Sequence, residues 1–200
     1  LFDRVNRGGT RLNNQEMRNA LYQGNATVLI NRLAKMKVFI DATEATIPAN
    51  HMKDRYLVLR FVAFYMWQKG ITKDVDTNEV LEYRSNLEDF LGKTMRFLNR
   101  LDSENDLFKE LEFRFAKAME LASQLIPLGG FRIPSSSGKK RPINMAFFES
   151  FSYLLSNLTG DKELLNGKIK QAYMQLMHES QYLDTLTHSV DSGTQTDERY

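Results

Sequence analysis

The sequence predicts a mainly α-helical protein, and three observations support this fold class. Apolar residues recur at spacings of three and four along most of the chain, which is the period of an amphipathic helix. The 200 residues include only 11 glycines and 4 prolines, counts that are too low for a loop-rich β protein. With 42% hydrophobic and 26% charged residues, a chain of this length can bury one sizeable core. We therefore predict a multi-helix bundle.

The first helix is expected over residues 14–23, directly after a glycine turn. Gly8 and Gly9 can adopt positive φ at little steric cost, so the chain can reverse direction tightly there. Asn13 can accept hydrogen bonds from free backbone N–H groups, and Glu16 follows at the spacing of a capping box. The segment is therefore expected to be an extended chain, a turn and then a capped helix.

The next two helices are expected on either side of a loop. Gly24 ends the first helix, and apolar residues at helical spacing predict a second over 26–38. A loop over 41–51 contains Pro48 and breaks the pattern. The stretch 54–69 is apolar on nearly all sides, so it should form the most buried helix.

Four further helices complete the pattern. Thr77 and Ser103 can each cap one of them, Gly160 ends the third, and the last is expected near 164–176. From residue 190 onward the chain is polar and expected to be frayed. Apolar residues at helical spacing mark these four helices: Leu87, Leu91, Met95 and Leu98; Phe108, Leu111, Phe115, Met119, Ala122 and Ile126; Phe147, Phe148, Phe151, Leu154, Leu155 and Leu158; Leu164, Leu165, Ile169, Ala172 and Leu176.

Composition and charge exclude several classes of protein. The formal net charge of +2 is too small to require a polyanionic partner, so any contact with nucleic acid depends on a local patch. The absence of cysteine excludes disulfides and thiolate metal sites and fits a reducing compartment. The longest apolar run, LVLRFVAFYMW, is too short for a bilayer and contains Arg60. With no signal-peptide pattern, we expect a cytoplasmic protein with no membrane partner.

The sequence offers little catalytic chemistry. His51, His178 and His188 have no acidic residue at a metal-ligand spacing that stands out, and we interpret them as solvated surface residues. The serines at 135–137 have no nearby base, so a linker role is favoured. No phosphate loop of the Walker type occurs. We therefore predict no catalytic residue and no metal site in this chain.

Arg60 stands inside the stretch that should form the most buried helix. Burying a lone guanidinium costs several kcal/mol, so it must meet a carboxylate, a phosphate or backbone carbonyls. A structural ion pair or a snorkelling side chain is favoured over an anion-binding role, and both alternatives stay open.

Two basic segments are candidates for contacts with phosphate. Lys139, Lys140 and Arg141 form a compact basic tip that can contact DNA phosphates, although exposed loop lysines are usually only solvated. The second segment surrounds the N-terminal glycine turn, where Arg4 and two further arginines cluster and Asn6 precedes the glycines. An asparagine in this place can hold the turn or bind a ligand, and the residues alone favour the first role.

The N-terminal segment FDRVNRGGTRLNNQEMRNALYQG resembles a known family. It is similar to the second signature of the ParB/sulfiredoxin-like domain in GmrSD-type modification-dependent restriction systems and in the related SspE phage-defence proteins. That signature has an aromatic residue, then Asn, one or two Gly, Leu and Glu before a helix. Phe2, Asn6, Gly9, Leu12 and Glu16 fall on this pattern.

Three later segments also resemble the helical part of that domain, in the expected order. They are MKDRYLVLRFVAF with Asp54 and Arg60, GGFRIP with Phe131 and Arg132, and RPINMAFFES with Asn144. The resemblance thus spans most of the chain. It implies a truncated ParB-like α+β segment followed by the helical bundle.

The resemblance also implies where the chemistry of the family lies. In such proteins an upstream Asp-Gly-Gln-Gln-Arg run supplies the nucleotide-hydrolysing or nuclease centre, and a His-Asn-His nuclease domain often follows. Neither occurs in these 200 residues. The full-length family uses GTP or ATP with a divalent cation and acts as NTP-dependent DNA endonucleases. Catalysis by this chain alone is not expected. The nucleotide-binding residues that the resemblance implies are Arg4, Asn6, Gly8, Gly9 and Glu16.

We therefore predict three parts: the second motif at 1–24, a helical domain at 25–188 and a polar tail at 189–200. The leading hypothesis is the helical part of a restriction or phage-defence NTPase-nuclease, which scaffolds a nucleotide-dependent site and helps to position DNA. Its partners, DNA and nucleotide, bind through the full-length protein, and a homo-oligomer is compatible with the family. The alternative is a non-enzymatic helical module for protein interaction or regulation.

Overall fold

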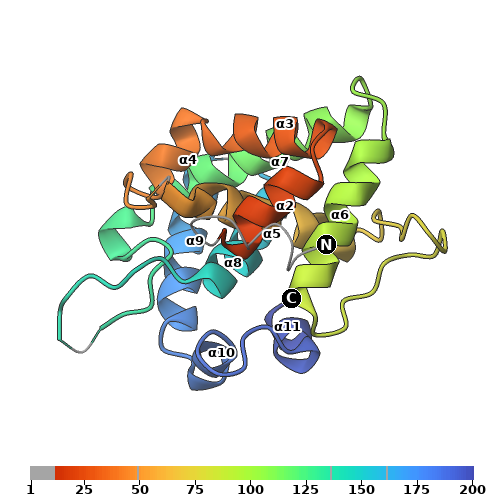
Figure 1. Cartoon of the computed structure of the whole chain (residues 1–200). Coiled ribbons are helices and arrows are strands. Elements are labelled where there is room, and N and C mark those ends of the chain that lie inside the picture. Colours follow the sequence, from red (N-terminus) through yellow and green to blue (C-terminus); the bar gives the residue numbers. More distant parts are fainter. Residues whose placement is uncertain (1–11, 49, 136, 161) are drawn as a thin grey trace.

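Helices make up 63% of the computed structural model, which describes residues 12–48, 50–135, 137–160 and 162–200. Within these ranges there are ten α-helices and no strand, so the prediction of a mainly α fold is confirmed (Figure 1). The α-helices are α2 (Asn14–Leu21), α3 (Asn25–Ala34), α4 (Lys37–Ala42), α5 (Lys53–Gln68), α6 (Leu87–Arg100), α7 (Asp106–Ser123), α8 (Met145–Asn157), α9 (Lys162–Leu176), α10 (Ser180–Thr185) and α11 (Gly193–Arg199). Two short 3-10 helices are η1 (Asn50–Met52) and η2 (Ile126–Leu128).

Helix α5 forms the centre of the core. All ten residues from Leu57 to Met66 are buried, as its apolar sequence predicts. It packs against α8, α3 and α6, and α7 packs against α8 and α4. In Figure 1, α3 and α4 lie along the top of the bundle, α6 lies on the right, and α10 and α11 lie at the bottom. A helix that contacts partners on several sides must be apolar around most of its circumference.

Aromatic rings fill the space between these helices. Phe115 of α7 lies 5.6 Å from Phe39 of α4 and 5.1 Å from Phe61 of α5, measured between ring centroids. Phe131 lies 4.7 Å from Phe148 of α8. Tilted ring pairs of this kind contribute about 0.5–1.5 kcal/mol each beyond the area they bury. They fix α4, α5, α7 and α8 relative to one another.

An asparagine side chain caps the N-terminus of four of the helices. The capping box predicted for α2 is confirmed: the Glu16 N–H donates to Asn13 Oδ1 at 2.9 Å, and the Asn13 N–H donates to Glu16 Oε2 at 2.8 Å. The predictions of caps at Thr77 and Ser103 are wrong. Asn86 caps α6 and Asn105 caps α7, while Asn144 caps α8.

Two further expectations about the helices need correction. The helix expected over 26–38 is two helices, α3 and α4, because Met36 adopts an extended conformation. That break turns Phe39 and Ala42 into the core. The expectation that residues 190–200 are frayed is also wrong. They include α11, whose Thr196 and Arg199 are buried because Arg199 meets an ion-pair partner in the core.

Candidate functional site

Arg60 forms a buried ion pair within the chain. Its side chain is 3% exposed, and its Nε donates to Glu149 Oε2 at 2.5 Å. Its Nη2 donates to Asp191 Oδ1 at 2.9 Å. Glu149 lies on α8 and is completely buried. The structural ion pair favoured by the sequence is therefore confirmed, and the alternative of an anion ligand is not needed to satisfy Arg60.

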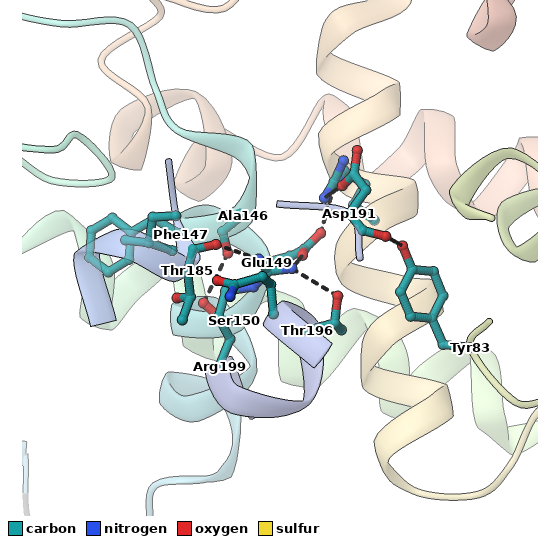
Figure 2. A network of polar contacts seen from close by, with 12 residues as sticks. Tyr83, Ala146, Phe147, Glu149, Ser150, Thr185, Asp191, Thr196 and Arg199 are labelled. Atoms are coloured by element: carbon teal, nitrogen blue, oxygen red, sulfur yellow. Dashed lines mark hydrogen bonds and ion pairs between the residues drawn. The ribbon is translucent and has the colours of Figure 1, made fainter. Parts of the chain in front are cut away.

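Arg199 completes this group of charges, which we call the buried charge cluster: the buried Arg60, Glu149 and Arg199, and Asp191, whose side chain is 43% exposed. Figure 2 labels Glu149, Asp191 and Arg199. Arg199 Nη2 donates to Glu149 Oε1 at 3.3 Å, and its Nη1 donates to the Thr185 carbonyl at 2.7 Å. The cluster thus ties α11 to α5, α8 and the end of α10.

Burial and pairing act in opposite directions on the pKa values in this cluster. Burial raises the pKa of Glu149 above its usual value, while Arg60 and then Arg199 limit the rise. Burial by itself lowers the pKa of Arg60, but the charge of Glu149, the hydrogen bond to it and the nearby Tyr56 and Asp191 together outweigh burial and hold that pKa well above the ordinary value. Guanidinium groups donate to both oxygens of Glu149, and such charge-assisted hydrogen bonds favour the ionised carboxylate. The cluster is a structural element of the fold.

A second buried arginine, Arg18 on α2, lies next to this cluster. Its side chain is 3% exposed. Its Nε and Nη2 donate to Gln15 Oε1 at 3.2 and 3.1 Å, and its Nη1 contacts Glu88 Oε2. The guanidinium lies 5.4 Å from the centroid of the Tyr56 ring, which Arg60 approaches at 5.6 Å. One aromatic ring therefore contacts both buried arginines, which is a favourable cation–π arrangement.

Three adjoining pockets, two of them lined by Arg18, form what we call the α2 groove. The first has a volume of about 400 Å³ and the second about 410 Å³, and they share Lys53 and Met145. The third, of about 320 Å³, shares Asn14, Arg18 and Glu88 with the first. The first is lined by Asn13, Asn14, Gln15, Arg18, His51, Lys53, Tyr56, Glu88 and Met145. The second is lined by Thr46, Ile47, Pro48, Lys53, Leu57, Arg132, Lys140, Arg141, Pro142, Ile143 and Met145. The third is lined by Asn14, Arg18, Tyr22, Asn86, Glu88, Asp89, Lys93 and Arg96.

The nucleotide-binding residues implied by the resemblance fall mainly outside the described part of the chain. Arg4, Asn6, Gly8 and Gly9 all lie there. Glu16 is described: it caps α2, and its Oε1 lies 3.4 Å from Nδ1 of an exposed histidine on η1. A role of these five residues in nucleotide binding stays a prediction.

Two residues of the basic tip line the second pocket. Lys139, Lys140 and Arg141 are exposed. Lys140 contacts Glu44 Oε1, and the same carboxylate accepts a hydrogen bond from Arg132 Nη1 at 2.6 Å. The hydrogen bond from Lys140, together with the charge of Arg132, lowers the pKa of Glu44. Lys140 and Arg141 line the pocket, and contact of the tip with DNA phosphate stays a prediction.

Other residues that carry the resemblance have structural roles. Phe131 is buried in the core, and the Asn144 amide donates to the Leu186 carbonyl at 2.9 Å in addition to capping α8. Sequence reasoning did not identify Arg18, Tyr56 or Glu149. For Glu149 a signal existed, because a single acidic residue stands in the apolar run MAFFESF.

His51, His178 and His188 are exposed, which agrees with their interpretation as surface residues. Over the described ranges, no three His, Cys, Asp or Glu residues are grouped so that they could hold a metal ion. In the same part of the chain, no helix has the length and apolar character needed to cross a membrane.

Comparisons with known proteins add no family to this geometry. No protein-family model matches the chain, and neither a curated protein nor a solved structure matches it with significance. The class that the fold defines is a mainly α bundle with a buried charge cluster and a groove beside it.

Proposed function

We propose that this chain is the helical part of a restriction or phage-defence NTPase-nuclease of the GmrSD and SspE type. In this role it scaffolds a nucleotide-dependent site and helps to position DNA. The observation that supports the proposal is a convergence. The segments that carry the resemblance are far apart in the sequence, yet residues from each of them line the α2 groove: Asn13, Gln15 and Arg18; Lys53, Tyr56 and Leu57; Arg132; Pro142, Ile143 and Met145.

The charges of the groove suit a phosphorylated ligand. Lys53 and Arg141 are exposed and have no acidic partner within the ranges that the structure describes. Arg132 is buried and held in place by Glu44 and by the Thr46 hydroxyl, 2.8 Å from its Nη2. Cations fixed along a groove can position phosphates by charge-assisted hydrogen bonds.

The groove by itself offers few such bonds. One or two charge-assisted hydrogen bonds, each worth about 1.5–3 kcal/mol before ordering costs, correspond to a dissociation constant of about millimolar or weaker. The resemblance places the remaining phosphate donors in the Asp-Gly-Gln-Gln-Arg run, which these 200 residues do not contain. We therefore expect no NTP hydrolysis and no tight nucleotide binding by residues 1–200.

Calorimetry with GTP and ATP, each with Mg²⁺, tests the proposal. The titration is run on this chain and on a longer protein in which a strand and an Asp-Gly-Gln-Gln-Arg run precede residue 1. We expect weak binding by the first and micromolar binding with hydrolysis by the second. Micromolar binding by the chain alone would show that the pocket is already complete. Absence of binding in both proteins would favour the non-enzymatic interaction module.

A further inference from the structure

We propose that Arg18 is the anchor for a phosphoryl group in the α2 groove, and that Glu88 takes the place of that group when no ligand is bound. The inference rests on the proposed function and assigns its phosphate contact to one side chain. The phosphoryl group can belong to a free nucleotide or to a DNA backbone, and the experiment below separates these two sources.

Arg18 is already held in the geometry that a phosphate contact requires. Gln15 Oε1 accepts from its Nε at 3.2 Å and from its Nη2 at 3.1 Å, while the guanidinium lies over the Tyr56 ring. Only Nη1 points to a charged partner, which is Glu88. A guanidinium fixed in this way loses little conformational entropy when it binds an anion, so each new hydrogen bond retains more of its free energy.

Glu88 is the part of this arrangement that can leave. Its side chain is 46% exposed, whereas Arg18 is 3% exposed. A half-exposed carboxylate regains most of its hydration when it swings away, and Arg18 then keeps its contacts with Gln15 and the Tyr56 ring, so breaking this ion pair costs less than breaking a fully buried one. Glu88 also stands in the first turn of α6, where the helix dipole stabilises a negative charge in either position. A phosphoryl group carries more charge and more acceptor oxygens than a carboxylate and competes well for Arg18.

The space around the pair fits this exchange. Arg18 and Glu88 line both the first and the third pocket, so the ion pair stands between cavities of about 400 and 320 Å³. Movement of Glu88 toward solvent connects the two cavities beside the guanidinium. Gln15 also lines the first pocket, is 4% exposed, and has a buried Nε2 with no hydrogen-bond partner in the described part of the chain. A buried amide donor without a partner is costly, and a bound phosphate oxygen would satisfy it.

Nuclear magnetic resonance titration tests the inference at the millimolar affinities expected for this chain. The Nε–H signal of Arg18 and the side-chain amide signals of Gln15 are followed in labelled protein at constant ionic strength. Tripolyphosphate, ATP with Mg²⁺ and a short DNA duplex are the probes. We expect tripolyphosphate to shift both sets of signals. A shift with ATP alone identifies the nucleotide as the source of the phosphoryl group, and a shift with the duplex alone identifies DNA.

Glu88→Gln is the decisive variant because it removes only the competing charge. It should bind tripolyphosphate about two- to fivefold more tightly than the wild type, which is the equivalent of one surface ion pair. Glu82→Gln is the matched control, since Glu82 pairs with the exposed Arg84 and its loss changes the net charge equally. Arg18→Lys should weaken binding and abolish the gain from Glu88→Gln. Urea unfolding of each variant shows whether it is folded.

Three results would overturn the inference, and they have different meanings. If the probes shift signals of Lys140 and Arg141 but leave Arg18 unchanged, the phosphate binds elsewhere in the groove and the proposed function stands. Equal gains in Glu88→Gln and Glu82→Gln would likewise remove the role of Glu88. If no probe shifts any signal at concentrations up to tens of millimolar, both the inference and the phosphate-binding part of the proposed function fail.

Discussion

Arg60 and Arg18 are equally buried, at 3% exposure, and both lie against the Tyr56 ring, but their partners differ. Arg60 pairs with the fully buried Glu149 as well as with Asp191, which is 43% exposed, whereas the carboxylate that pairs with Arg18 in the described part of the chain is 46% exposed. Burial of an arginine therefore does not distinguish a structural residue from one that is available to a ligand. The exposure of its partner does.

The physical reason is the cost of separating each pair. Removing one partner of a buried ion pair leaves a charge without compensation and costs about 3–5 kcal/mol. A half-exposed carboxylate exchanges its partner for water, so only the buried guanidinium loses a partner and the net cost should be smaller than that of a fully buried pair. The buried charge cluster is thus expected to hold the fold, whereas the Arg18 pair is expected to exchange.

The largest effect is expected from Glu149→Gln. The substitution leaves two buried guanidinium groups without their shared carboxylate, and we expect the free energy of unfolding to fall by about 3–5 kcal/mol. Domains are typically stable by only about 5–15 kcal/mol, so the variant should unfold at clearly lower urea concentration. A loss below about 1 kcal/mol would mean that the buried charge cluster contributes no more to stability than an exposed ion pair, which would contradict its difference from the Arg18 pair.

A smaller and more local effect is expected from Arg199→Ala. Arg60 still compensates Glu149, but the Thr185 carbonyl and one carboxylate oxygen lose their donor, which costs about 2–3 kcal/mol. Amide hydrogen exchange should show faster opening of α10 and α11 than of α5. Uniformly faster exchange over the whole chain would show that the cluster does not act through α11.

The Tyr173 hydroxyl is a buried polar group with no charged hydrogen-bond partner among the described residues. It donates to the carbonyls of Gly130 at 2.9 Å and Leu128 at 3.2 Å. Burial raises its pKa to about 12, whereas the unfolded chain titrates near 10. The unfolded state therefore loses the proton first, and stability should be full below pH 10 and fall as the pH rises toward 12.

Urea unfolding at a series of pH values measures this slope, which is the fall in the free energy of unfolding between pH 10 and pH 12. Tyr173→Phe should make it less steep without abolishing it, because burial also raises the pKa values of Tyr65 and Tyr83 to about 12. An unchanged slope in Tyr173→Phe would show that Tyr173 does not contribute to it.

The smallest effect on stability is expected from Glu88→Gln, below the about 3–5 kcal/mol expected when a fully buried pair is broken. Its carboxylate is half exposed, so solvation offsets part of the loss, and the glutamine oxygen can still accept a hydrogen bond from Arg18. Urea unfolding compares it with Glu82→Gln, which removes an exposed charge at another site. A loss as large as that of Glu149→Gln would assign Arg18 to the fold rather than to a ligand.

Local patterns predicted the long helices and one of the four members of the buried charge cluster, Arg60. Arg60 was recognisable because a single charge inside an apolar run must be paired. Glu149 shows the same signal in MAFFESF, but the two stand 89 positions apart and only the fold brings them together. The polar sequence of 190–200 gave no sign of α11, since its burial depends on Arg199 reaching Glu149.

The candidate site was less predictable for the same reason. Arg18 has the sequence context of a surface residue on a short amphipathic helix, and its burial arises from Tyr56 and from Glu88, 70 positions away. The caps at Asn86 and Asn105 were missed because other residues with capping side chains precede both helices, and spacing alone does not choose among them.

The most direct measurement is the free energy of unfolding of the wild type and Glu88→Gln, with and without tripolyphosphate at matched ionic strength. A ligand that binds the folded state stabilises it by RT ln(1 + [L]/Kd), about 1.4 kcal/mol at ten times Kd. We predict similar stability without ligand and a larger gain in Glu88→Gln with ligand. Equal gains in the two proteins, or no gain in either, would contradict the exchange of Glu88 for a phosphoryl group at Arg18.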